Sequence, residues 1–378
     1  MSGVGRVRAA VLREIGAAGP YAESQPLQVV ELGLDGPGPG ELLVRVRAAG
    51  LCHSDLSVIN GSRPRPVPMV LGHEAAGEIV EVGPETSGFA PGDHIVLSFV
   101  PACGYCPRCL GGRPALCEPG AVANRGGHLL SGARRWRDAG GEQPFHHLGV
   151  SAFAEYTVVS ARSAVLVPKE LPFETAALFG CAVLTGAGAA IHSARIEPGE
   201  RVAVFGLGGV GLAAVLGALV AGAGQLVAVD LVEGKRSLAA ELGASDTVVG
   251  GPDAVAAVRE LTGGGADKVI DTTGSVRVLE QAYAATRAGG TTVTVGLPHP
   301  DHQLTLPALS LVAEERTLRG SYLGSSVPGR DIPRFIALHA AGRLPVHRLL
   351  SHRLTLDEIN TGFDRLACGE AVRQVVTL

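Results

Sequence analysis

The 378-residue chain is long enough for two domains, and 46% of its residues are hydrophobic, which is ample material for a core in each. Its 32 basic residues nearly balance 36 acidic ones, so a net charge of -4 gives no reason to expect nucleic acid or a membrane as a partner. Charged residues interrupt every apolar stretch near the N-terminus, so no signal peptide is expected, and the predicted location is the cytoplasm.

The first half of the chain alternates short β-like runs with turns rich in glycine and proline. From about Leu42 to Val167 lie the runs LLVRVRA, HIVLS and EYTVVS, with the turn DGPGPG before the first run and turns such as APGD between them. This pattern predicts a β-rich domain with long functional loops.

From about Glu200 the pattern changes to a strand followed by a helix, repeated. The predicted strands are RVAVF, LVAVD, TVV, KVID and TVTVG, with helical stretches between them. Alternating units of this length predict a doubly wound parallel sheet. The uncharged run from Val202 to Gln225 is long enough for a membrane helix, but its glycines favour a strand, a turn and a helix.

The segment after Leu323 is too short for a third domain. It reads as a helix from Asp331 to Ala341, an amphipathic helix LDEINTGFDRLA and a closing strand VRQVVTL. We therefore expect it to complete the first domain, so that residues 1–182 and 324–378 form one domain and residues 183–323 form the other.

Four of the seven cysteines crowd into one loop in the pattern CxxCxxCx7C; they are Cys103, Cys106, Cys109 and Cys117. Thiolates at these spacings can converge on one zinc and fill all four positions, which predicts a structural site. An iron–sulfur cluster or free buried cysteines are the alternatives. The clustering suits metal binding in a reducing compartment better than disulfides, and Cys368 is expected to be a small buried apolar residue.

Three short motifs far apart in the chain supply a second set of ligands. They are Cys52-His53-Ser54-Asp55, Gly72-His73-Glu74 and Gly180-Cys181. Each is a weak signal alone, because a single buried cysteine or histidine is more often packing than ligand. Together they offer two thiolates, an imidazole and a carboxylate, which is the chemistry of a zinc site with one position left for water or substrate.

A glycine-rich turn follows the predicted strand RVAVF and opens a helix. Its sequence GLGGVG matches GxGxxG, with candidate contacts at Gly206, Gly208, Gly209, Val210 and Gly211. Such a turn lets a pyrophosphate approach the helix N-terminus, where unpaired N–H groups favour an anion. Asp230 ends the next strand, where its carboxylate can accept both ribose hydroxyls and would repel a 2′-phosphate, so NAD is favoured over NADP.

With these motifs in this order, the chain resembles the zinc-dependent alcohol dehydrogenases of the medium-chain dehydrogenase/reductase family, from about residue 27 to the C-terminus. The resemblance implies an α/β protein with a GroES-like β-rich catalytic domain and a doubly wound Rossmann domain that binds the dinucleotide. It implies that Cys52, His73 and Cys181 bind a catalytic zinc. Glu74 is then a nearby or transient ligand, and the cysteine quartet binds a second zinc.

The same resemblance implies further contacts with the cofactor. These are Lys235 at the adenosine ribose, His53 and Arg373 at the pyrophosphate, and Thr185 and Val210 beside the nicotinamide. Histidine in place of the commoner arginine at the first pyrophosphate position makes the grip more sensitive to pH.

In the catalytic reading, Ser54 accepts the proton of the alcohol and Asp55 fixes the tautomer of His73. Ser57 stands where many family members carry a histidine of the proton relay, so the proton must leave by another route. An apolar pocket for aliphatic or aromatic alcohols is assigned to Phe99, Val122 and Leu148.

The expected activity is the reversible, NAD-linked oxidation of primary alcohols to aldehydes, with two zinc ions per subunit. The alternatives are a dehydrogenase of the same fold for secondary alcohols or polyols, and one that holds NAD permanently. A non-catalytic NAD-binding zinc protein would need the open zinc position to be absent. The segment from Glu118 to Gly149 resembles the insertion of long-type, commonly dimeric members, which predicts a homodimer, and His146 and His147 within it are expected to be polar loop residues.

Overall fold

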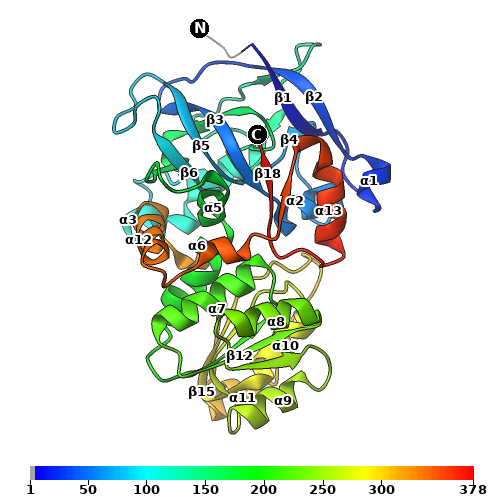
Figure 1. Cartoon of the computed structure of the whole chain (residues 1–378), viewed down its shortest axis with the longest axis vertical. Helices are drawn as coiled ribbons and strands as arrows, with labels where there is room; N and C mark the ends of the chain where they lie inside the picture. Colours follow the sequence, from blue (N-terminus) through cyan, green and yellow to red (C-terminus); the bar gives the residue numbers. More distant parts are fainter. Residues whose placement is uncertain (1–4) are drawn as a thin grey trace. The chain divides into compact units, whose positions relative to one another are not determined.

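The computed structural model describes residues 5–378, and their contacts divide the chain into two compact units (Figure 1). The second unit comprises Ala182–Ser326 and Phe335–Leu349, and the first comprises the rest of the described chain. The segment after 324 was expected to belong wholly to the first domain, but Phe335–Leu349 groups with the second unit. Buried side chains and an ion pair of 2.9 Å between Arg348 and Glu241 attach it there.

Two β-sheets form the first unit. In the smaller sheet the strand order is β7 (Trp136–Arg137), β2 (Leu27–Leu34), β1 (Arg6–Leu12), β4 (Met69–Val70) and β8 (Phe145–His146). In the larger sheet it is β10 (Ala164–Leu166), β6 (His94–Leu97), β5 (Glu74–Val82), β3 (Glu41–Gly50), β18 (Gln374–Thr377) and β17 (His352–Leu354), with β9 (Tyr156–Ser160) also paired to β3. Alternate residues of β1 enter two different cores: Ala10 and Leu12 one, Val7 and Val11 the other. The strand is therefore buried on both faces.

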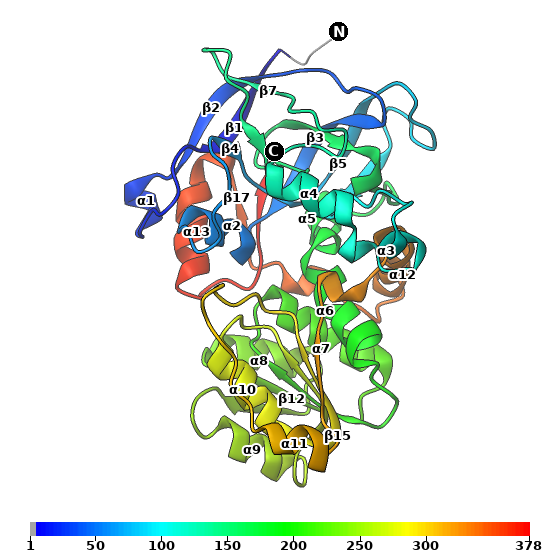
Figure 2. The same ribbon diagram turned by 180° about the vertical axis from the view of Figure 1, so that it is seen from behind.

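Short helices cover the sheets of the first unit. They are α1 (Tyr21–Ser24), α2 (His53–Ile59), α3 (Pro107–Leu110), α4 (Glu118–Gly126), α5 (Phe173–Ala177) and α13 (Ile359–Ala367), with 3₁₀ turns η1 (Pro114–Leu116), η2 (Ala161–Ser163), η3 (Leu178–Gly180) and η7 (Leu356–Glu358). The C-terminal α13 packs beside α1 (Figure 2). There the carboxylate of Asp364 accepts the backbone N–H groups of Tyr21 and Ala22 at 2.6 and 2.8 Å. The two ends of the chain are thus tied together in one unit. Helix α12 (Pro328–Ala340) runs from the first unit into the second.

The second unit is a single parallel sheet with helices. Its strand order is β13 (Asp246–Val249), β12 (Gln225–Asp230), β11 (Arg201–Phe205), β14 (Ala266–Asp271), β15 (Thr286–Thr294) and β16 (Thr317–Gly320). The helices are α6 (Ala182–Gly188), α7 (Gly209–Ala221), α8 (Glu233–Leu242), α9 (Ala254–Leu261), α10 (Val276–Ala285) and α11 (Ala308–Ala313), with the turns η4 (Ala189–Ala194), η5 (Leu323–Ser325) and η6 (Val346–Leu349). This is the doubly wound arrangement predicted from the sequence.

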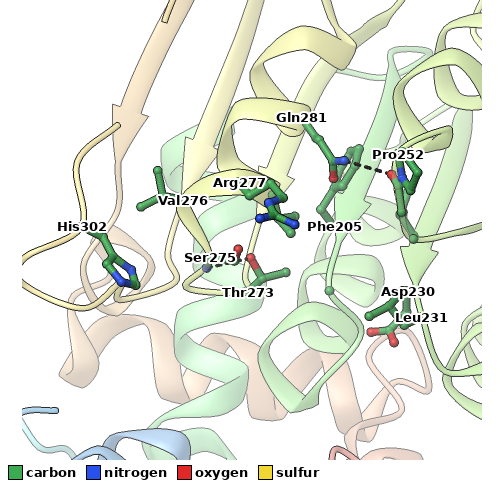
Figure 3. A pocket seen from close by; sticks show the side chains of 15 residues that line it. Phe205, Asp230, Leu231, Pro252, Thr273, Ser275, Val276, Arg277, Gln281 and His302 are labelled. Atoms are coloured by element: carbon green, nitrogen blue, oxygen red, sulfur yellow. Dashed lines mark hydrogen bonds between the residues drawn. The ribbon is translucent and has the colours of Figure 1, made fainter. Parts of the chain in front are cut away.

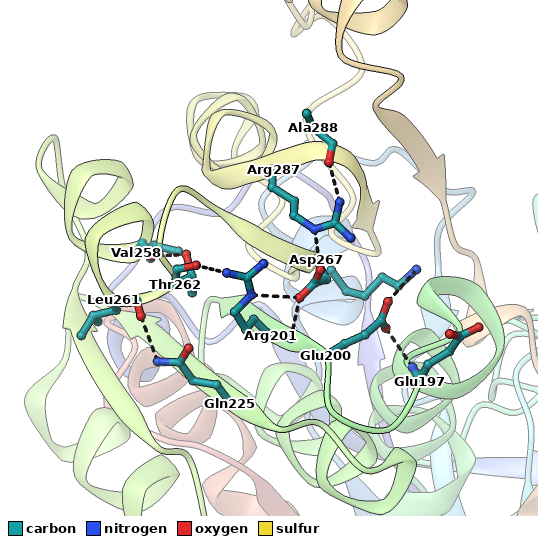
Figure 4. Close-up of polar contacts among 11 residues, drawn as sticks. Glu197, Glu200, Arg201, Gln225, Val258, Leu261, Thr262, Asp267, Arg287 and Ala288 are labelled. Carbon is teal, nitrogen blue, oxygen red and sulfur yellow. Dashed lines mark hydrogen bonds and ion pairs between the residues drawn. The ribbon is translucent and has the colours of Figure 1, made fainter.

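An ion cluster joins the amino ends of three neighbouring strands in the second unit (Figure 4). Asp267 in β14 accepts the backbone N–H of Arg201 at 2.7 Å and its Nε at 3.2 Å, and it pairs with Arg287 in β15. These contacts are only partly exposed and fix the register of β11, β14 and β15 at one edge of the sheet. The carboxyl ends of the same strands lie at the opposite edge of the sheet, which is where ligands bind to open parallel sheets.

No single helix within residues 5–378 has the length and apolar composition to cross a membrane. The consecutive segments Phe173–Gly180 and Ala182–Ala194 meet those criteria only when they are joined. The uncharged run after Val202 is divided, as predicted, between the strand β11, a turn and the helix α7.

Candidate active site

Two thiols and one imidazole meet at one place in the first unit. Cys52 precedes α2, His73 lies between β4 and β5, and Cys181 follows η3. One ligand atom from each lies within 4.8 Å of the other two, and all three side chains are buried. A tetrahedral zinc with bonds of about 2.3 Å to sulfur keeps its ligands roughly 3.8 Å apart. The cluster therefore has the donors and the spacing that zinc requires.

Asp55, on α2, contacts the ring of His73. Its Oδ1 lies 3.1 Å from His73 Nδ1 and accepts the backbone N–H of Gly72 at 3.2 Å. Burial by itself would raise the pKa of Asp55, but the imidazoles of His73 and His147 outweigh it and hold the pKa well below its usual value. Asp55 is thus a carboxylate near neutral pH, and Nε2 is the ring nitrogen of His73 left for a metal.

A hydrogen bond links the side chains of Cys52 and Cys181. A hydrogen bond from the thiol of Cys181 lowers the pKa of Cys52, and the same bond raises the pKa of Cys181. Metals bind the thiolate form of cysteine, so a bound zinc would displace this proton.

Glu74, the first residue of β5, forms a buried ion pair with Arg373. Arg373 Nε donates to Glu74 Oε1 at 3.1 Å, its second nitrogen donates to Oε2, and its third donates to the carbonyl of Leu51 at 3.0 Å. Burial opposes the charge, but Glu74 and the two neighbouring thiols raise the pKa of Arg373. Both carboxylate oxygens of Glu74 therefore face a permanent cation.

The four cysteines of the loop after β6 also converge. Their sulfurs lie within 4.8 Å of one another, with 3.9 Å between those of Cys103 and Cys109. Backbone N–H groups point at the sulfurs: Cys106 donates to Cys103 at 3.3 Å, and Cys103 donates to Cys117 at 3.2 Å. A hydrogen bond from the backbone of Cys109 lowers the pKa of Cys106 to about 6. Four sulfurs held in this way fit a closed tetrahedral zinc site.

The glycine-rich turn of the second unit separates β11 from α7. Gly206 has a φ of +86°, and a Cβ there would lie 2.7 Å from Thr273, whereas a Cβ at Gly211 would lie 1.8 Å from the carbonyl oxygen of Gly206. Packing inside the unit therefore explains these two glycines. A Cβ at Gly208, the N-cap of α7, would meet nothing within 4 Å, so the space in front of this helix N-terminus is open to a ligand.

A cavity of about 720 Å³ opens at the carboxyl ends of the strands, beside this turn (Figure 3). It is lined by Gly206, Asp230, Leu231 and Thr273 among others, and by Arg277 and Gln281 from α10. Asp230 Oδ2 accepts the backbone N–H of Leu207 at 2.7 Å, and Oδ1 accepts that of Val232 at 2.8 Å. Each oxygen keeps a further lone pair, so the oriented carboxylate can accept two more hydroxyl groups.

Known proteins resemble this chain over nearly its whole length. The family model described as alcohol dehydrogenase GroES-like domain matches residues 38–169, and the one described as zinc-binding dehydrogenase matches residues 209–341. An NDMA-dependent alcohol dehydrogenase of Amycolatopsis methanolica is 40% identical over 95% of this chain and 98% of its own. The chain belongs to the zinc-containing alcohol dehydrogenases of the medium-chain dehydrogenase/reductase family.

Two further members of this alcohol dehydrogenase family carry names that include a substrate. A geraniol dehydrogenase of Castellaniella defragrans is 40% identical, with 98% of this chain and 97% of that one covered. The crystal structure of a benzyl alcohol dehydrogenase from Acinetobacter calcoaceticus is 32% identical, with a TM-score of 0.90 over 99% of this chain and 100% of that one. The predicted family and fold class, a GroES-like domain with a Rossmann domain, are confirmed.

The remaining predicted site residues of this alcohol dehydrogenase lie in both units. In the first unit His53 is exposed and Ser54 half-buried at the start of α2, and Phe99 meets the ring of His73 edge-on with centroids 5.4 Å apart. Leu148 is buried, but Val122 is 55% exposed on α4. In the second unit Thr185 lies on α6, Gly209 and Val210 begin α7, and Lys235 is buried on α8.

The structure contradicts the predictions for Cys368 and for the histidine pair His146 and His147, and His147 contacts a residue of the site. Cys368 is exposed because it follows the last turn of α13, beyond the face that packs on the core. His146 and His147 are not polar loop residues: both are buried, and Nδ1 of His147 lies 3.1 Å from Asp55 Oδ1. Burial lowers the pKa of both imidazoles, that of His146 to about 3. The apolar residues on either side, PF and LGV, were the only sequence signal of this burial.

The buried ion pair gives a stability prediction. We expect Arg373→Met to lower the free energy of unfolding by about 3–5 kcal/mol, because it leaves the carboxylate of Glu74 buried without a cation. The double variant Arg373→Met/Glu74→Gln should recover much of that loss. Urea unfolding followed by the fluorescence of Trp136, the single tryptophan, measures both. A double variant no more stable than Arg373→Met would contradict this account.

Proposed function

We propose that this zinc-containing oxidoreductase converts primary alcohols to aldehydes with NAD, at a zinc held by Cys52, His73 and Cys181. The observation that carries the proposal is the buried convergence of these three side chains. The cluster supplies three ligands, which leaves one tetrahedral position for the oxygen of an alcohol. The cysteine quartet fills all four positions of a second zinc and has no room for substrate.

The proposed substrates are aromatic or aliphatic primary alcohols. Phe99 and Leu148 present apolar surface in the same unit as the cluster, and Phe99 contacts the ring of His73 directly. The names of two relatives include geraniol and benzyl alcohol, both of which are primary alcohols with unsaturated carbon next to the carbinol. Val122, with more than half of its side chain in solvent, is the weakest of the three candidates for the pocket.

Zinc, when bound, would act as the Lewis acid at the alcohol oxygen, and the nicotinamide would accept the hydride. The residues of the chain divide the remaining work. Asp55 holds the imidazole of His73 in one tautomer and orientation. Ser54 takes the hydroxyl proton of the alcohol. Ser57 cannot continue a histidine relay, since its hydroxyl already donates to the carbonyl of His53 at 2.8 Å.

The second unit is proposed to hold the adenosine half of NAD. Asp230 accepts the ribose hydroxyls, Lys235 supports this end of the cofactor, and the turn from Gly206 to Gly211 faces the pyrophosphate. Thr185 and Val210 are the proposed neighbours of the nicotinamide. Arg373 and His53 of the first unit are the proposed cations for the pyrophosphate, and Glu74 then serves to orient Arg373 rather than to bind metal.

The first test is metal removal. The purified protein should contain two zinc ions per chain and should form NADH from benzyl alcohol or geraniol, with a slower rate on a secondary alcohol. Removal of zinc from the Cys52 cluster with a chelator should abolish NADH formation, and added zinc should restore it. Cys181→Ser should lose one zinc and the activity together. Full activity in protein shown by metal analysis to be free of zinc would refute the proposal.

A second candidate is an enzyme that keeps its NAD bound between turnovers. It is favoured by one observation, that a relative 40% identical is named for its dependence on NDMA. Gel filtration of the purified protein separates the two candidates. Bound NAD that survives desalting, with turnover only when an external electron acceptor is added, would support the second candidate, and turnover that needs fresh NAD supports the first.

Cofactor choice gives a further prediction. Asp230→Ser should raise the KM for NAD roughly 10- to 100-fold through the loss of charged hydrogen bonds, and it should improve the use of NADP because a repulsive charge is gone. Steady-state kinetics with both cofactors measures the change. The control is Asp253→Ser, an exposed carboxylate in the same unit that does not line the cavity. An unchanged ratio of kcat/KM for the two cofactors would exclude Asp230 from this role.

We also propose a homodimer formed through the second unit. Its last strand, β16, has an unpaired edge, and the neighbouring α11 exposes Leu309 and Val312 by 77% and 79%. An open strand edge beside exposed apolar side chains is a surface that a second copy can cover.

The dimer proposal predicts that Val312→Glu yields monomers. Light scattering coupled to gel filtration should then give half the mass of the unmodified protein, because a buried unpaired carboxylate opposes association. Leu110→Glu, which changes an equally exposed leucine of the first unit, serves as the control and should leave the mass unchanged. A monomeric unmodified protein would reject the proposal directly.

A further inference from the structure

A second imidazole reaches the carboxylate that holds His73. Asp55 Oδ1 lies 3.1 Å from Nδ1 of His73 and 3.1 Å from Nδ1 of His147. The rings of the two histidines meet edge to face, with centroids 5.5 Å apart at 85°. All three side chains are at most 2% exposed, so no solvent competes for these contacts.

The backbone around His147 fixes its position against the segment that leads to His73. His147 N–H donates to the hydroxyl of Ser151 at 2.8 Å, and that hydroxyl donates to the carbonyl of Val70 in β4 at 2.8 Å. The carbonyl of His147 accepts the N–H of Val150 at 3.0 Å. These contacts fix the backbone of His147 beside the segment that leads to His73.

The buried side-chain atoms without a hydrogen-bond partner in the described residues include one from each of these side chains, Asp55 Oδ2 and His147 Nδ1. A buried polar group without a partner costs about 1–3 kcal/mol. His147 Nδ1 lies 3.1 Å from Asp55 Oδ1, so a proton on this nitrogen, directed at the carboxylate, gives the imidazole a hydrogen bond at little change in position.

We propose that His147 is a positioning residue for the catalytic metal: its Nδ1–H holds the carboxylate of Asp55, which in turn orients the ligand His73. The inference rests on the proposed function, since it takes His73 to be a zinc ligand. His147 thereby joins Asp55 in the series of contacts that orients the ligand His73. Groups that orient a metal-binding histidine typically change metal affinity about 10- to 100-fold when they are removed.

Two substitutions separate hydrogen bonding from packing. His147→Phe keeps a ring of similar shape but has no donor, whereas His147→Asn places an amide N–H close to the position of Nδ1. We expect zinc to leave the Cys52 cluster about 10- to 100-fold faster in His147→Phe, with a smaller change in His147→Asn. His146→Gln is the matched control, because it alters the adjacent buried histidine, whose ring lies beside Trp136 and whose Nε2 accepts the backbone N–H of Arg135.

The release of zinc to a coloured chelator, followed in time, gives the rate for each variant, and zinc release from the cysteine quartet, which His147 does not touch, serves as an internal reference. Cobalt(II) in place of zinc should show an altered visible spectrum in His147→Phe and a restored one in His147→Asn. With benzyl alcohol, the Phe variant should lose kcat more than it raises KM for NAD. Trp136 fluorescence during urea unfolding reports any general loss of stability.

Each outcome decides the inference. Equal zinc release and equal cobalt spectra in the Phe variant and the unmodified protein would overturn it, as would a Cys52 cluster that binds no metal. Loss of a third metal equivalent in the variants would also overturn it, because the Asp55, His73 and His147 group would then be a metal site of its own. An unmodified protein that holds both zinc ions but oxidises no alcohol refutes the proposed function alone, and the release rates still decide the role of His147.

Discussion

Burial of charged and polar groups is the constraint on which the proposed active site depends. In a water-free interior each such group is stable only with a partner, and the first unit provides partners in pairs. Arg373 neutralises Glu74, and Asp55 receives the backbone of Gly72 and the ring of His73. These pairings hold the segments that carry the two thiols and the imidazole in place before any metal arrives. Metal binding then replaces a proton with a cation and needs little rearrangement.

In the second unit the important feature is the cavity at the carboxyl ends of the parallel sheet. The ion cluster around Asp267 fixes the amino ends of three strands, at the edge of the sheet opposite the cavity. At the carboxyl ends of the strands, Gly206 and Gly211 let the turn and the start of α7 pack closely against their neighbours. A Cβ at Gly208 would meet nothing within 4 Å. Asp230 is oriented by two backbone N–H groups and remains able to accept more. The sheet thus presents an oriented carboxylate to a ligand.

Local sequence patterns predicted the parts that short segments form alone. The cysteine quartet and the glycine turn each lie within one stretch of chain, and the βα alternation from about Glu200 is a repeated local pattern. The fate of His147 could not be read in this way, because two histidines in a glycine-rich loop have no periodicity that would indicate burial. The prediction for Cys368 was wrong for a related reason: the residue directly follows α13, and which side of that helix faces the core depends on neighbours from elsewhere in the chain.

The sequence by itself therefore determined the family, the fold class and the candidate metal ligands, since the spacing and the chemical type of these residues are properties of the chain. Only the tertiary structure decided which carboxylate faces which cation, and that His147 reaches Asp55. The tertiary structure also decided that Phe335–Leu349 belongs to the second unit. The physical reason is that packing between distant segments sets such contacts, from about 90 positions apart for Asp55 and His147 to 299 for Glu74 and Arg373, and no local sequence pattern reports that packing.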